Sequence, residues 1–183
     1  MPASAAARFY RMRTAIRSPP HRRRSALRTM WPLAVLALLV GLTLVFVAEP
    51  VRVSSDSMAP TFHAGDHVLV AKVGARSHHP HRRDVIAFHL PGSSDLLIKR
   101  VVAVGGNSVG IADGVLVVNG RPVHESFVDY NLVDATYFGP VRVPRDTVFV
   151  MGDNRSNSID SRRFGPVPVS DILGRVVLAI WPP

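Results

Sequence analysis

Short apolar runs, separated by glycine, proline, asparagine and aspartate, fill the chain after residue 50. Runs rich in valine, isoleucine and leucine occupy residues 67–73, 84–90, 96–104, 115–118, 147–151 and 174–181. Their length and their turn-forming boundaries are typical of β-strands. Asn119 and Gly120 stand between VLVV and RPV, which is the pattern of a two-residue hairpin. Residues 50–183 therefore predict an all-β domain with an antiparallel or mixed, barrel-like sheet.

A different pattern precedes this region. From Trp31 to Ala48 the chain reads WPLAVLALLVGLTLVFVA, which contains no charged residue. A helix of this length spans about 27 Å, close to the ~30 Å hydrocarbon core of a bilayer. A cleavable signal peptide usually has a shorter apolar core followed by a small-x-small pattern, and Phe46 and Val47 break such a pattern. We therefore expect an uncleaved transmembrane α-helix, a signal anchor, over residues 31–49.

The distribution of charge changes the meaning of the composition. The 183 residues carry 22 Lys+Arg and 13 Asp+Glu, a formal net charge of +9 that suggests a polyanionic partner. However, residues 1–30 hold eight arginines and no acid, whereas the rest is nearly neutral. We therefore expect no nucleic-acid partner. The positive-inside rule predicts a single-pass protein of the plasma membrane, with residues 1–30 as a basic cytoplasmic tail and residues 50–183 extracytoplasmic. An organellar transit peptide, which is also arginine-rich and acid-free, remains an alternative.

Two segments contain candidate chemistry. SSDSMAPT, over residues 54–61, places Ser57 in a stretch whose composition is also typical of an ordinary surface turn. LLIKRVVAV, over residues 96–104, contains Lys99, one of two lysines beside 20 arginines. On the strand period of two, Leu97 and Val101 share its face, so that loss of solvation should lower its pKa. A lysine general base needs such a shift, although a snorkelling edge-strand lysine would explain the segment equally well.

A third segment, MGDNRSNSIDSRRFGP over residues 151–166, gathers polar side chains between a strand and a Gly-Pro turn. It is either a polar loop with local side-chain turns or a hydrogen-bonded platform that orients a neighbouring site.

Taken together and in this order, SSDSMAPT, IKRVVAVGG and MGDNRSNSIDSRRFGPV resemble the type I signal peptidases (leader peptidases), membrane-bound serine endopeptidases that use a Ser-Lys dyad. The resemblance covers about residues 31–183. It implies that Ser57 is the nucleophile and that Lys99 is the general base. It implies that Ser55 assists the oxyanion hole, that Ser158 orients the lysine, and that an ion pair supports the loop. The residues concerned in these three roles are Ser55, Ser158, Asp160 and Arg162.

The resemblance also implies a substrate and a shape. Shallow apolar pockets for small side chains would be lined by Val51, Val53 and Ile98. The expected activity is removal of N-terminal signal peptides from exported preproteins with small-x-small cleavage sites, without a cofactor or a metal and with membrane lipid around the anchor. The spacing from Lys99 to Gly152 is short, so a second, capping region around residues 105–145 should be small. The chain departs from the family pattern at Ser54, Asn107 and Ser156.

The sequence also bears on four alternatives. Ser57 lacks the G-x-S-x-G setting of a histidine-dependent triad. His78, His79 and His81 lack paired metal-ligand spacing, which favours a solvated loop. Self-cleaving repressors also use serine and lysine, but they need a DNA-binding module and a scissile bond before the serine. A membrane-anchored β-domain of the same fold that binds partners or has lost activity stays open, and it would not require Ser57 and Lys99 together.

Overall fold

The computed structural model describes residues 31–39, 41, 48–72, 80–90, 92–130 and 137–181. The chain divides into two compact units, residues 1–41 and 42–183. Residues 31–39 are helical, and within the described ranges no helix is both long and apolar enough to cross a membrane. The predicted tail and residues 40 and 42–47 of the predicted anchor lie outside those ranges. Ala48 and Glu49, its last two residues, belong instead to a strand, because they pair with Ala71 and Val70.

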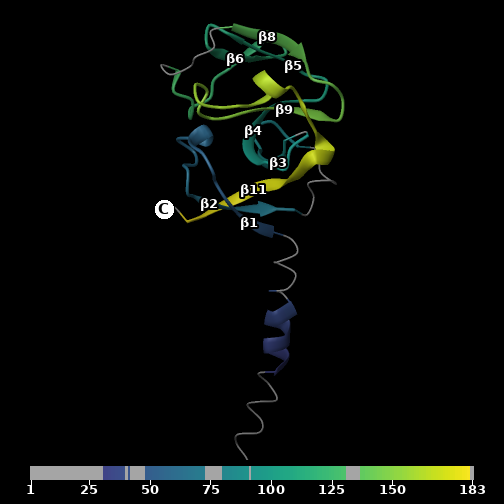
Figure 1. The fold of residues 1–183 in the computed structure, drawn as a ribbon. Helices are drawn as coiled ribbons and strands as arrows, with labels where there is room; N and C mark the ends of the chain where they lie inside the picture. Colours follow the sequence, from purple (N-terminus) through teal and green to yellow (C-terminus); the bar gives the residue numbers. More distant parts are fainter. Residues whose placement is uncertain are drawn as a thin grey trace, which may run out of the picture. The chain divides into compact units, whose positions relative to one another are not determined.

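The second unit is built from two antiparallel sheets (Figure 1). The larger sheet contains, in spatial order, β1 (Ala48–Arg52), β2 (His67–Ala71), β11 (Ile172–Trp181), β3 (Val85–His89), β4 (Leu96–Val104), β9 (Thr147–Met151) and β10 (Val167–Pro168). The smaller contains β7 (Arg121–Val123), β6 (Val115–Val118), β5 (Ser108–Ala112) and β8 (Tyr137–Arg142). Short helical turns are η1 (Asp56–Met58), α2 (Ser161–Phe164) and η3 (Val169–Asp171). The predicted all-β class of the domain is confirmed.

The hairpin predicted from Asn119 and Gly120 joins β6 to β7. Both residues have positive φ, 53° and 73°, as the two-residue turn requires. Gly110, in the middle of β5, has a different reason to be glycine. A Cβ there would lie 2.8 Å from the carbonyl oxygen of Phe138, so only glycine lets β8 approach β5 this closely.

Three apolar clusters form the core, and they explain why the sheets hold together. The first joins the sheets, since it combines residues of β4 and β9 with residues of β5 and β6; its buried members are Val102, Ala103, Val109, Ile111, Leu116, Val118, Val143, Phe149 and Met151. The second packs beneath β1 and β2; its buried members are Val51, Val53, Met58, Val68, Val70, Ala87 and Ile98. The third lies between β3, β4 and β9. Met58 matters most here, because it fixes the turn that contains Ser57.

Candidate active site

Ser57 lies in the 3-10 turn η1, and the turn is fixed from two sides. The Met58 side chain is fully buried in the core, and Ser57 itself is 8% exposed. The loop after β9 holds the same turn. The backbone N–H of Asn154 donates to the Ser57 carbonyl at 3.1 Å, and the Asn154 side-chain amide donates to the Asp56 carbonyl at 3.2 Å. The serine hydroxyl is therefore presented on a stable piece of backbone despite its irregular surroundings.

Lys99 reaches Ser57 from strand β4. Its Nζ donates to Ser57 Oγ at 2.5 Å, across 42 residues of sequence, and the lysine is 3% exposed. Ile86 stands directly opposite Lys99 in the β3–β4 pairing. Directly opposed residues and residues two apart share a face, so Ile86, Leu97 and Val101 are the neighbours of the lysine on the sheet. The lysine is thus surrounded by apolar side chains and directed at one hydroxyl.

This environment lowers the pKa of Lys99 from 10.5 to about 8. The main cause is desolvation, because burial disfavours the charged ammonium. The carboxylates of Asp160 and Asp153 act in the opposite direction but do not cancel it. At pH 7 roughly a tenth of the lysines would be neutral, compared with about 0.04% of ordinary ones. A neutral amine beside a hydroxyl can accept its proton, which is the condition for an activated serine nucleophile.

Gly152, the first residue after β9, lies against the Ser57 turn. Its N–H donates to Asp160 Oδ2 at 3.1 Å, and its carbonyl accepts from Arg155 Nε at 3.0 Å. A Cβ at this position would lie 2.4 Å from the Ser57 carbonyl oxygen and 2.3 Å from Ser158 Oγ. No side chain fits there, so glycine allows the loop to pack directly on the nucleophile's backbone.

The two other candidate serines lie close to the pair. Ser55 Oγ donates to Ser57 Oγ at 3.2 Å. Ser158 Oγ is buried, and it has no hydrogen-bond partner among the described residues. The expected hydrogen bond between Ser158 and Lys99 is therefore not formed in this conformation. The close approach of Ser158 to Gly152 explains its position: its hydroxyl fills the space that a side chain at residue 152 would take.

Asp160 and Arg162 form an ion pair, with Arg162 Nε 2.9 Å from Asp160 Oδ1. Asp160 is fully buried and also caps helix α2, since it accepts the N–H of Arg162. Arg162 Nη2 donates in addition to the Arg155 carbonyl at 2.7 Å. The pair therefore ties the two ends of the loop together.

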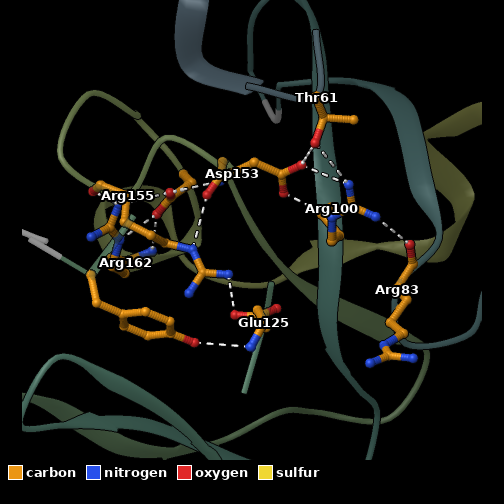
Figure 2. A network of polar contacts seen from close by, with 10 residues as sticks. Thr61, Arg83, Arg100, Glu125, Asp153, Arg155 and Arg162 are labelled. Carbon is orange, nitrogen blue, oxygen red and sulfur yellow. Dashed lines mark hydrogen bonds and ion pairs between the residues drawn. The ribbon is translucent and has the colours of Figure 1, made fainter. Parts of the chain in front are cut away.

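Two further ion pairs surround the site, and the sequence did not single them out (Figure 2). Arg100 holds Asp153 with both Nε and Nη2, at 2.8 Å and 2.6 Å. Thr61 donates to the same carboxylate at 2.5 Å. Arg155 forms a second pair with Glu125, and both side chains are buried. The position of Arg100 next to Lys99 was a usable signal, because strand alternation turns it to the opposite face, where a partly buried arginine needs a carboxylate.

A small depression adjoins Ser57 and Lys99. It is lined by Arg52, Val53, Ser54, Ser55, Ser57, Met58, Leu96, Leu97, Ile98 and Lys99. Two of the three expected pocket residues, Val53 and Ile98, line it. Val51 does not line it, although it belongs to the same buried cluster as the other two. In the described ranges no group of histidine, aspartate and glutamate side chains could hold a metal ion. His78 and His79 lie outside those ranges, whereas the exposed His81 contacts Asp84.

Comparison with known proteins gives matches over most of the chain. Residues 26–181 match the family model described as signal peptidase, peptidase S26. The chain is 37% identical over 149 residues to a signal peptidase I of Leptolyngbya laminosa, covering 75% of this chain and 70% of the relative. It is 39% identical over 164 residues to a probable signal peptidase I-1 of Synechocystis sp., covering 82% and 81%. A crystal structure of a signal peptidase I from Enterococcus faecalis is similar at 30% identity, with a TM-score of 0.48, covering 54% of this chain and 97% of that one.

Proposed function

Because the chain belongs to the signal peptidase family, peptidase S26, we propose that Ser57 and Lys99 are the catalytic dyad with which it removes signal peptides from exported preproteins. It is a serine endopeptidase, as its relatives indicate. The observation that carries the assignment of the dyad is the 2.5 Å contact between Lys99 Nζ and Ser57 Oγ. Because the pKa of Lys99 is lowered, a fraction of the lysines is neutral near pH 7 and can accept the proton of the Ser57 hydroxyl.

The reaction follows from this geometry in two halves. Neutral Lys99 accepts the hydroxyl proton of Ser57 while Oγ attacks the scissile carbonyl carbon. The resulting oxyanion is stabilised by the Ser57 N–H with help from the Ser55 hydroxyl. The Lys99 ammonium then gives its proton to the leaving amine, and the mature protein departs. In the second half Lys99 takes a proton from water and the hydroxide attacks the Ser57 ester. The bond between the acyl carbon and Ser57 Oγ then breaks, the Lys99 ammonium returns its proton to Oγ, and the signal peptide is released as the carboxylic acid.

The substrate is proposed to bind as an extended chain beside β4. Residues 96–100 of β4 pair with β3 on one edge, but pairing with β9 begins only at Arg100. In the part of the chain that is described, the other edge of residues 96–99 has no partner strand. The depression that ends at Ser57 lies along this edge, between residues 52–55 and 96–99. An added strand would satisfy the free backbone groups, and the shallow floor at Val53 and Ile98 would favour small side chains.

Membrane anchoring is part of the proposal. The uncharged run at residues 31–48 and the arginine-rich residues 1–30 support a single span over residues 31–49, with a cytoplasmic tail, an extracytoplasmic catalytic domain over 50–183 and lipid around the span. The described residues of this run expose large apolar side chains, among them Trp31, Leu33, Leu36 and Leu38. Protease treatment of sealed cells tests the orientation. A catalytic domain on the cytoplasmic side would contradict it.

Cleavage by the purified full chain in detergent tests the dyad. A preprotein with a small-x-small site is the substrate, and Ser57→Ala and Lys99→Met are the variants. Each variant should lose at least a thousandfold in kcat, since nucleophile and base act as one unit. Matched controls are Ser94→Ala and Lys72→Met, because neither residue lines the depression at Ser57, Ser94 is exposed and Lys72 pairs with Glu49 on the surface. The controls should cleave normally.

The competing proposal is a membrane-anchored β-domain that binds preproteins without cutting them. It predicts no cleavage by wild type, and binding that is indifferent to Ser57→Ala and Lys99→Met. Cleavage by wild type that either variant retains in full would show a peptidase with a different mechanism. Cleavage that both variants abolish is the result that the dyad requires.

A further inference from the structure

Glu125, which no sequence motif singled out, reaches the candidate site from the smaller sheet. It lies in the connection between β7 and β8, and its carboxylate pairs with Arg155; the two side chains are 6% and 3% exposed. A tight turn holds Glu125 in place, since the Val128 N–H donates to the Glu125 carbonyl at 3.1 Å. The Glu125 N–H donates to the Tyr130 hydroxyl at 2.9 Å. The carboxylate is therefore a fixed group in the interior.

Arg155 connects Glu125 to Gly152, because its guanidinium binds both. While Nη2 holds Glu125, Nε donates to the Gly152 carbonyl at 3.0 Å. The Gly152 N–H is held from the other side by Asp160. The Gly152 backbone in turn lies so close to the Ser57 carbonyl that not even a Cβ would fit between them. A continuous series of contacts thus runs from Glu125 to the backbone of the nucleophile.

A second contact of the same turn reaches the same loop independently. Phe127, two residues after Glu125, lies with its ring 4.2 Å from the guanidinium carbon of Arg100. Arg100 holds the Asp153 carboxylate. The turn therefore contacts both arginines that fix residues 152 and 153: Glu125 contacts Arg155 by charge (Figure 2), and Phe127 contacts Arg100 by its aromatic face.

We propose that Glu125 is a positioning residue for the reaction, which rests on the proposed Ser57–Lys99 dyad. Its carboxylate keeps the Arg155 side chain in the one orientation that also binds the Gly152 carbonyl. Without it, Arg155 is a buried cation without its partner, and it turns toward other acceptors or toward solvent. Gly152 is then released on one side, and Ser57 loses its alignment with Lys99. Glu125 touches no reacting atom. Its loss acts through the alignment of Ser57 with Lys99, so it should lower kcat rather than raise KM.

Steady-state cleavage kinetics of the full chain test this role. Glu125→Gln keeps the shape and removes the charge, and it should lower kcat by about 10- to 100-fold with KM within about twofold of wild type. Arg155→Lys keeps the charge, but an ammonium cannot hold both Glu125 and Gly152, so a similar loss is expected. The double variant should lose little more than either single variant, because both break the same series of contacts. Asp113→Asn is the matched control, since Asp113 is an exposed carboxylate of the same sheet.

Rates are compared per folded molecule, with the folded fraction measured by circular dichroism at the assay temperature. A wild-type kcat for Glu125→Gln after this correction would overturn the proposal, as would a rise in KM alone or losses that add in the double variant. Ser57→Ala in the same assay separates the two claims. If it still cleaves, the dyad and the role of Glu125 both fail. If it is inactive while Glu125→Gln is fully active, only the role of Glu125 fails.

Discussion

Lys99 and Arg100 are neighbours on β4, but the surroundings of the two cations differ in one respect: whether a carboxylate pairs with them. Lys99 contacts the Ser57 hydroxyl, and within the described ranges no carboxylate lies at ion-pair distance from it. Arg100 is paired with Asp153 through two hydrogen bonds and is covered by an aromatic ring. The arginine, which holds the loop in place, has a counter-charge, whereas the lysine proposed as the base is buried without a carboxylate at ion-pair distance.

The difference follows from the chemistry of the two side chains. An arginine stays charged at every physiological pH, so its burial has to be compensated by a carboxylate. A lysine can lose its proton, so burial among apolar groups lowers its pKa, here to about 8. Exchanging, removing or titrating these groups therefore tests the comparison directly.

The largest effect should come from Lys99→Arg. It keeps the positive charge but supplies no base, so kcat should fall by about a thousandfold or more. Arg100→Lys, the reverse exchange one residue away, should lower kcat only by about tenfold, because an ammonium still attracts Asp153 but cannot hold it at two points. Cleavage of a preprotein measures both, with Lys72→Arg as the control. Equal losses for the two exchanges would contradict the comparison.

The next effect concerns stability. Asp153→Asn leaves Arg100 partly buried without its counter-charge, and the free energy of unfolding should fall by about 3 to 5 kcal/mol. Urea unfolding of the full chain in detergent measures the change. Asp113→Asn, which alters an exposed carboxylate, should stay within about 0.5 kcal/mol of wild type. If Asp153→Asn is as mild as this control, the Arg100 network does not hold the loop.

Lys99→Met should act in the opposite direction and raise the free energy of unfolding at pH 7 by about 3 kcal/mol. That figure is the free-energy equivalent of lowering the lysine pKa from 10.5 to about 8. Between pH 8 and 10.5 the unfolded lysine binds more protons than the folded one, so wild type gains stability as the pH rises. The advantage of the variant should therefore be complete below pH 8 and vanish by about pH 10.5. Urea unfolding at several pH values, with Lys72→Met as control, decides this; an advantage independent of pH would refute the desolvation argument.

The last test is the pH dependence of wild-type cleavage. The reaction needs neutral Lys99, so kcat should rise about tenfold per pH unit at low pH and level off above about pH 8. Lys72→Met should show the same profile. A rise that continues to pH 10.5 would mean that the active base is an ordinary exposed amine.

The strands that could be predicted were those formed by continuous runs of apolar residues. All six apolar runs after residue 50 contain strands, and in five of them valine, isoleucine or leucine side chains are buried in the core. In the run at residues 174–181 only Val176 packs against the core, whereas Val177, Leu178 and Ile180 are exposed. Strands β1, β5, β8 and the two-residue β10 were not predicted, and for the first three the reasons are specific. β1 follows directly on the apolar run taken as the anchor. β5 and β8 contain Gly110, Gly139 and Pro140, which interrupt a strand pattern, yet here a glycine is needed so that the two strands can approach.

The sequence indicated the centre of the candidate site and the Asp160–Arg162 ion pair beside it, but not the Glu125–Arg155 pair. Ser57 and Lys99 stand in short segments with recognisable composition, and the fold brings them together. Glu125 stands in HESFVDY, a segment without periodicity, and its partner lies 30 residues further along the chain. The residues next to Glu125 in the sequence do not indicate that its carboxylate is buried. Its burial becomes evident only in the folded domain, where it meets Arg155.

The register of β4 against β3 has a consequence for the folding of the enzyme and the onset of its activity. Strand pairing sets Lys99 opposite Ile86, and a slip by one residue would bring the neighbouring arginine, which cannot act as a base, to the serine. Ser57 and the loop after β9 come from segments far apart in the chain, so a partly folded molecule lacks the proposed dyad. On the proposed mechanism, completion of the fold is also the activation step, and a nascent copy should not cut proteins around it until both sheets have formed.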